Sequence, residues 1–154
     1  MNETLRKGSG ARLLVVEDEA IVRADLNQTL SDLGYDVVAS TSSGELAVAL
    51  ALASEPDAVL MDITLRGGMD GVNASKKIRQ SADVPVIFMT AHSDARTMLR
   101  VKETAHAGYL QKPFEDRLLA ETVEKVFSKR DPKRILTSLL HLENHSYHRS
   151  GINE

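Results

Sequence analysis

Reactive side chains stand at or just beyond the ends of four short apolar segments of this chain. They are Glu17, Asp18, Asp62, Thr90 and Lys112. Three carboxylates that converge need a cation, and hard oxygen ligands with open positions suit Mg²⁺. A lysine ammonium can pair with a carboxylate and later with a phosphoryl oxygen, to which a threonine hydroxyl can also donate. If these side chains meet, the set suits phosphoryl transfer onto an aspartate.

Asp62 follows the four apolar residues 58–61. Such a segment is short for a helix and typical of a buried parallel strand. Because carboxylates are rarely buried without a partner, an aspartate that closes this strand is expected at the carboxyl edge of the sheet, where open α/β sheets bind ligands. The simpler alternative is that Asp62 caps the following loop, and this segment alone does not decide between the two.

Segments with strand and helix patterns alternate along the chain. Strands are expected at residues 13–16, 35–39, 58–61, 85–89 and 108–110. Helices are expected at residues 21–33, 43–54, 72–80, 94–105 and 115–127. Five β-α units in strict alternation predict the α/β class, with a doubly wound parallel sheet and helices on both faces. The carboxyl ends of parallel strands share one edge, so this fold would bring the reactive side chains together.

The helix patterns also predict faces and ends. Apolar residues recur in the first helix at Ile21, Val22, Leu26, Leu30 and Leu33. Their spacing predicts a buried stripe, and Gly34 is expected to end that helix. Ser42 or Ser43 is expected to cap the second helix and Ser93 the fourth. The fourth helix has few large apolar residues, so it is expected to be loosely held.

Composition bounds the class of protein. The chain has 154 residues, 42% of them hydrophobic and 27% charged, as in one ordinary globular domain. Its net charge of −3 gives no sign of nucleic-acid binding. The absence of cysteine excludes disulfides and thiolate metal sites and fits a reducing cytosol. The sequence shows neither an apolar segment near the roughly 18 residues of a membrane span nor a secretory signal, so we expect a cytoplasmic protein without membrane or direct nucleic-acid contact.

The chain divides into three parts. Residues 1–11 are expected to form a flexible leader, residues 12–128 the globular domain, and residues 129–154 an extension with a short helix at about 133–142. The leucines of that helix would pack on the domain or on a second copy. Histidines follow at His141, His145 and His148. They could bind Zn²⁺ on one helix face, but a polar tail favours the simpler reading without a metal.

Four segments together resemble the receiver domain of two-component response regulators over residues 12–128. They are residues 14–19 (LVVEDE), 59–63 (VLMDI), 86–91 (VIFMTA) and 108–114 (GYLQKPF). Each segment alone is a weak signal, but four in this order at strand ends are highly specific. The resemblance implies the flavodoxin/CheY-like fold with strand order 2-1-3-4-5.

The resemblance also implies a role for each reactive residue. Asp62 would be the phosphoacceptor, and Thr90 and Lys112 would hold the phosphoryl group. The implied ligands of Mg²⁺, or of Mn²⁺ in its place, are Glu17, Asp18, Asp62 and the backbone carbonyl of Thr64. The Lys112–Pro113 peptide bond would be cis, as is usual in the family.

Further positions resemble the switch and tuning residues of receivers. Tyr109 stands where the family carries its aromatic switch residue, and it would turn inward when Thr90 moves toward the phosphoryl group. The alternative is that Tyr109 is plain packing at the sheet edge. Thr64 and His92 stand at variable positions that tune how long the phosphoryl group survives.

The implied function is a signalling switch and not an enzyme, although a receiver catalyses its own phosphorylation and dephosphorylation. A sensor histidine kinase or phosphotransfer protein would donate the phosphoryl group. The face formed by the fourth helix, fifth strand and fifth helix would bind a downstream protein or a second copy. Two alternatives stay open: a receiver-like interaction module that is never phosphorylated, and a receiver fragment of a longer regulator. A small-molecule aspartyl-phosphate phosphatase is less favoured, because Thr64 stands where such enzymes usually carry a second aspartate.

Overall fold

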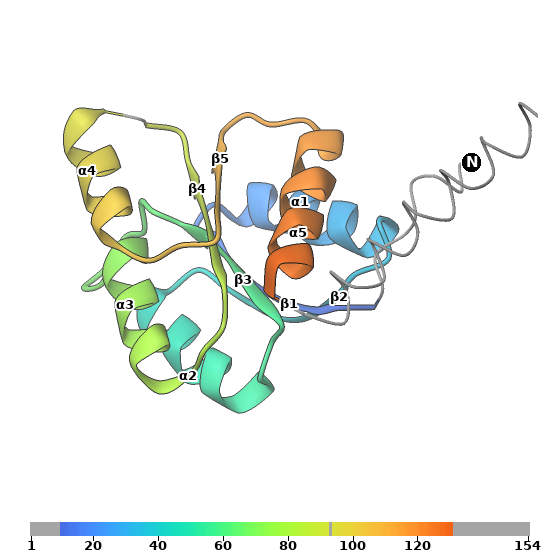
Figure 1. Ribbon diagram of the computed structural model, residues 1–154, viewed down its shortest axis with the longest axis horizontal. Coiled ribbons are helices and arrows are strands. Elements are labelled where there is room, and N and C mark those ends of the chain that lie inside the picture. Colours follow the sequence, from blue (N-terminus) through green and yellow to red (C-terminus); the bar gives the residue numbers. More distant parts are fainter. Residues whose placement is uncertain (1–9, 93, 131–154) are drawn as a thin grey trace, which may run out of the picture.

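The computed structural model describes residues 10–92 and 94–130 of the chain. Within these residues a five-stranded parallel sheet has the order β2-β1-β3-β4-β5 and is covered by five helices (Figure 1). The elements are β1 (Arg12–Val16), α1 (Ala20–Asp32), β2 (Asp36–Thr41), α2 (Gly44–Ser54), β3 (Ala58–Asp62), α3 (Gly71–Ser81), β4 (Val86–Thr90), α4 (Ala95–Glu103), β5 (Gly108–Gln111) and α5 (Asp116–Arg130). The predicted fold class and strand order are therefore confirmed.

The sheet separates two apolar layers because successive strand residues point to opposite faces. In β1, Leu14 and Val16 pack with α2 and α3, whereas Leu13 and Val15 pack with α1 and α5. Figure 1 shows α2 and α3 on one side of the sheet and α1 and α5 on the other. Strands buried on both faces read as continuous apolar runs, which explains why the sequence signal was so clear.

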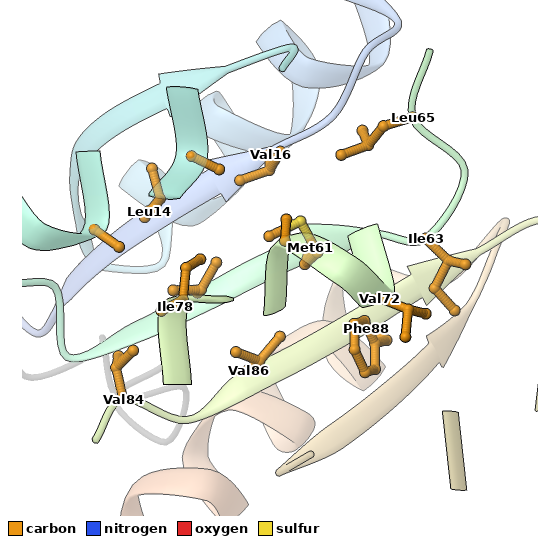
Figure 2. Packing of buried hydrophobic residues seen from close by; sticks show 14 of the residues in the cluster. Leu14, Val16, Met61, Ile63, Leu65, Val72, Ile78, Val84, Val86 and Phe88 are labelled. Carbon is orange, nitrogen blue, oxygen red and sulfur yellow. The ribbon is translucent and has the colours of Figure 1, made fainter. Parts of the chain in front are cut away.

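The strand that carries Asp62 is held firmly from the α3 side. Figure 2 shows Met61 of β3 in the same buried cluster as Val72 and Ile78 of α3 and Phe88 of β4. All four side chains are fully buried. Burial of side chains of this size stabilises a fold by roughly 1.5–3 kcal/mol each, so the end of β3 is a rigid support.

The predicted apolar stripe of α1 is wrong in its first turn. Leu26 and Leu30 are buried against β1, but Ile21 is 85% exposed and Val22 is also exposed. The first turn lies outside the apolar cluster that the later turns form with the sheet. Spacing alone could not show where the sheet stops covering the helix.

Helix ends follow the sequence closely, with two corrections. Gly34, with a φ of 94°, follows the end of α1, and the Ser43 side chain caps α2 by accepting from Leu46 N–H. α4 is capped by Asp94 and not by Ser93, because the Asp94 carboxylate accepts from Thr97 N–H at 2.9 Å.

The second correction concerns α5, which continues to Arg130, beyond its predicted end at Phe127. Val126 and Phe127 are buried, and this packing supports the last turns of the helix. Residues 1–9 of the predicted leader and the predicted helix at 133–142 with its histidines lie outside the described residues. Among the helices that are described, none has the length and apolar character needed to span a membrane.

Candidate phosphoryl-transfer site

Strand register places Glu17 next to Asp62. β1 and β3 are parallel neighbours, and Val16 lies beside Met61. The next residue of each strand end is therefore a carboxylate, Glu17 in one and Asp62 in the other. Glu17 stays attached to the sheet because its N–H donates to Thr41 O at 3.0 Å.

The other side of Asp62 is built by β4 and β5. Asp62 pairs with Met89 of β4, so Thr90 is one residue further along the same edge. Thr90 pairs in turn with Gln111 of β5, and Lys112 follows. The N–H of Lys112 donates to Thr90 O at 2.7 Å, and the Lys112–Pro113 peptide bond is cis, as the family resemblance implied.

The Lys112 ammonium lies between two buried carboxylates. Its Nζ is 2.9 Å from Asp62 Oδ2 and also donates to Glu17 Oε1. Both acids are buried, and such charges are costly unless they are paired. Lys112 therefore neutralises part of the charge of two acids from which it is separated by 95 and 50 positions in the chain.

Three carboxylates converge closely enough to share one cation. Glu17, Asp18 and Asp62 each offer an oxygen, and these three oxygens all lie within 4.8 Å of one another. Hard, anionic oxygen donors are those that Mg²⁺ and Mn²⁺ prefer, and Asp18 is only half-buried. The donor set thus fits the predicted divalent cation.

A small cavity of about 180 Å³ opens beside Asp62. Its lining residues are Asp18, Glu19, Asp62, Thr64, Arg66, Ala91, His92 and Lys112. Thr64 orients the phosphoacceptor candidate, because its N–H donates to Asp62 Oδ1 at 2.9 Å. The carboxylate of Asp62 is thus fixed by Thr64 on one oxygen and by Lys112 on the other.

Burial and neighbouring charge control the protonation of the site. Burial raises the pKa of Asp62, the hydrogen bond from Lys112 lowers it, and the negative charge of Glu17 raises it again, to about 6 overall. For Lys112, burial lowers the pKa, but the hydrogen bonds to Glu17 and Asp62 outweigh it and raise the pKa. Lys112 therefore stays cationic, whereas full ionisation of Asp62 at neutral pH is helped by a further cation.

Thr90 and Tyr109 were predicted as the switch pair. Thr90 is buried at the same edge, but its hydroxyl donates to His92 O at 2.8 Å and accepts from His92 N–H at 3.0 Å, so it is bonded to its own loop and not to Asp62. Tyr109 is half-buried, and its covered hydroxyl finds no hydrogen-bond partner among the described residues. The imidazole-bearing residue His92 is exposed.

Sequence reasoning missed three residues near the site. Arg66 contacts Asp18, its Nε lying 3.4 Å from Asp18 Oδ2. Gly71 packs directly on Asp62, because a Cβ at Gly71 would lie only 2.0 Å from Asp62 O. Arg100 of α4 forms an ion pair with Asp70, the residue before Gly71. No local pattern in the loop at residues 65–71 reveals these long-range contacts.

Comparison with known proteins identifies the family. The protein-family model of the response regulator receiver domain matches residues 13–124 of the chain. The transcriptional regulatory protein PdtaR of Mycobacterium tuberculosis is 34% identical over 118 residues, which are 77% of this chain and 57% of that protein. The response regulator UvrY of Escherichia coli is 35% identical over 118 residues, covering 75% of this chain and 54% of that protein. The chain spans little more than half the length of these relatives.

A solved structure agrees in fold and sequence. The signal receiver domain of a modulated diguanylate cyclase from Desulfovibrio desulfuricans is 36% identical, with a TM-score of 0.74, and the match covers 77% of this chain and 94% of that domain. The acids, lysine and hydroxyl described above lie within the matched family region. The chain therefore belongs to the response regulator receiver domains of two-component signalling systems.

Proposed function

We propose that Asp62 accepts a phosphoryl group and that its phosphorylation switches the surface with which the domain binds partners. The observation that carries this proposal is the contact of the Lys112 ammonium with both Asp62 and Glu17 at the carboxyl edge of the sheet. A buried carboxylate beside a fixed cation is suited to attack on a phosphoryl group, because the cation can neutralise the charge that gathers on the phosphoryl oxygens.

Glu17, Asp18 and Asp62, with the backbone carbonyl of Thr64, would hold Mg²⁺ or Mn²⁺. The ion would supply charge neutralisation for the phosphoryl oxygens and would favour the ionised form of Asp62. The close approach of the three carboxylate oxygens supports this assignment.

The transfer itself is a balanced exchange of bonds. An Asp62 oxygen attacks phosphorus, the bond from phosphorus to a phosphohistidine nitrogen breaks, and the donor imidazole leaves with that electron pair. Lys112 can then bind a phosphoryl oxygen while it keeps Glu17 paired. Hydrolysis returns Asp62 to its carboxylate, and Thr64 and His92, which line the adjoining cavity, would tune that rate. Since the product stays on the protein, the domain is better described as a switch than as an enzyme.

The switch would act through Thr90 and Tyr109. Thr90 would exchange the bond that it donates to His92 O for one to a phosphoryl oxygen. Tyr109 carries a covered hydroxyl without a partner, and such a group costs roughly 1–3 kcal/mol. This cost lowers the preference for the present position of the Tyr109 side chain over one in which water bonds to the hydroxyl. A small difference in free energy between the two positions would let phosphorylation shift their populations. The responding surface would be α4, β5 and α5, which would bind a downstream protein or a second copy.

The phosphodonor would be a sensor histidine kinase or phosphotransfer protein in the cytoplasm. A cavity of about 390 Å³ between α1 and the start of α5 borders both Glu17 and Lys112. Val22 of α1 is exposed and lines this cavity. Ile21, the residue before it in the chain, is also exposed. Such a surface beside the nucleophile supports docking of a protein donor.

Acetyl phosphate with Mg²⁺ tests the phosphoacceptor directly. Intact-mass measurement should show one added phosphoryl group, and borohydride trapping should locate it on Asp62. Asp62→Asn should abolish the modification. The matched control is Asp57→Asn, directly before the opposite end of the same strand, where the side chain accepts from Arg12 N–H at 2.7 Å. Wild-type protein that stays unmodified with both acetyl phosphate and candidate kinases would favour the unphosphorylated interaction module instead.

A further inference from the structure

Arg66 is a second cation at the mouth of the site. Its Nε lies 3.4 Å from Asp18 Oδ2, and its backbone N–H donates to the same oxygen at 3.2 Å. Arg66 also lines the small cavity that Asp62 and Lys112 line. Arg66 is thus placed by its loop to reach the space that a donor phosphoryl group must enter.

The contact between Arg66 and Asp18 is easily exchanged. The Arg66 side chain is 83% exposed, and exposed ion pairs contribute little to stability. A divalent cation held by Asp18 would compete for the same carboxylate. Arg66 can then leave Asp18 without a large cost, while its backbone N–H keeps the loop near the site.

Lys112 and a bound divalent cation would together only balance the three carboxylates of the site. Three carboxylates converge there, and the Lys112 ammonium is already bonded to two of them. A donor phosphoryl group adds further negative charge to this surface. Of the described residues that line the small cavity, Arg66 is the one whose permanent cation is mostly in solvent and can turn toward the donor.

We propose that Arg66 is a positioning residue that exchanges Asp18 for the phosphoryl group of the incoming donor. A planar guanidinium can bind two phosphoryl oxygens at once and hold the group over Asp62. The ligand class is a phosphoramidate or an acyl phosphate. This inference rests on the proposed phosphorylation of Asp62.

The exchange predicts effects of opposite sign on two ligands. Without its charge, residue 66 no longer competes for Asp18 or repels a divalent cation, so the metal should bind more tightly. The donor loses a cation, so it should bind more weakly. A merely structural role would instead weaken both, because both depend on the same loop.

Arg66→Gln is the test variant, and Arg66→Lys keeps the charge without the planar fork. Arg117→Gln is the matched control, since Arg117 is 85% exposed and its Nε lies 3.2 Å from Glu121 on α5. Mn²⁺ binding is measured by electron paramagnetic resonance, and phosphorylation is measured over a range of acetyl phosphate concentrations at saturating Mg²⁺. Arg66→Gln should tighten Mn²⁺ binding roughly twofold and raise the KM for acetyl phosphate roughly threefold, with little change in the maximal rate. Both effects should shrink at high salt.

Several outcomes would overturn the assignment of Arg66. They are weaker Mn²⁺ binding together with weaker donor binding, a change in maximal rate alone, and equal effects of Arg66→Gln and Arg117→Gln. Failure of the underlying function is distinguishable from these, because wild-type protein would then gain no phosphoryl group at any acetyl phosphate concentration.

Discussion

Arg100 of α4 holds the carboxylate of Asp70, the residue that caps α3. Its two terminal nitrogens lie 2.8 and 3.2 Å from the two Asp70 oxygens, and Asp70 also accepts from Asn73 N–H at 2.9 Å. Val101 is the one residue of α4 that is buried. The pair therefore helps to anchor a helix that belongs to the proposed output surface.

Asp70→Asn should loosen α4 while it preserves the cap of α3, because asparagine caps helices as well as aspartate does. Loss of the half-exposed ion pair should cost about 0.5–1 kcal/mol, and amide exchange in α4 should accelerate more than in α3. Hydrogen-exchange mass spectrometry measures both helices. Glu121→Gln, which breaks the Arg117 pair on α5, is the control, and equal exchange in α4 for both variants would contradict the anchoring role.

Gly71→Ala should be strongly destabilising. The added Cβ would lie 2.0 Å from Asp62 O and 2.8 Å from Asp62 C, and neither backbone atom can turn aside as a side chain could. We expect a loss of about 2–3 kcal/mol in urea unfolding and impaired phosphorylation, because Asp62 itself must shift.

Gly68→Ala is the control in the same loop. Its Cβ would meet only the end of the flexible Glu45 side chain at 3.0 Å, so a small effect is expected. Equal stability losses for the two alanine variants would show that backbone crowding at Asp62 is not the cause.

Asp62 should make the metal-free protein less stable as pH rises. Its pKa of about 6 lies above the ordinary 3.8, so the folded state binds the proton more tightly than the unfolded state does. This contribution is fully present below pH 3.8 and is lost as pH rises through about 6. Asparagine at position 62 cannot ionise and so avoids this loss, and the Asp62→Asn variant should be more stable than wild type at pH 7.5 with EDTA, by up to about 3 kcal/mol.

The measurement is urea unfolding of both proteins at several pH values, with and without Mg²⁺. Mg²⁺ should stabilise the wild type selectively, because it binds the ionised carboxylates. Parallel stability curves for wild type and Asp62→Asn between pH 4 and 7.5 would refute the raised pKa.

Lys112→Met should remove the charge that pairs Glu17 with Asp62. Two buried carboxylates would then face each other unpaired, and we expect a loss of about 2–4 kcal/mol at neutral pH. Mg²⁺ should restore part of this stability but not phosphorylation by acetyl phosphate. Lys125→Met, at an exposed position of α5, is the control for loss of one lysine. Loss of stability that Mg²⁺ does not reduce would point to packing and not to charge.

The apolar strands and their order along the chain could be predicted because burial on both faces makes each strand a continuous apolar run. α2 shows where such patterns lose their power. Residues 46–53 (LAVALALA) have no helical period, and in the structure Ala47 and Ala51 are buried whereas Leu46 and Leu52 are 56% and 49% exposed. Close packing at Gly44, where a Cβ would lie 2.7 Å from Met69 O, favours small side chains on the inner face.

The amino-acid sequence by itself determined which chemical groups stand at the strand ends, because strand period and loop residues are local properties. Tertiary structure alone decided their partners: Lys112 meets Glu17 across 95 residues, and Arg66 meets Asp18 across 48. It also decided that Ile21 faces solvent. These outcomes depend on how closely separate elements approach and which surfaces they bury, and a local sequence pattern does not contain that information.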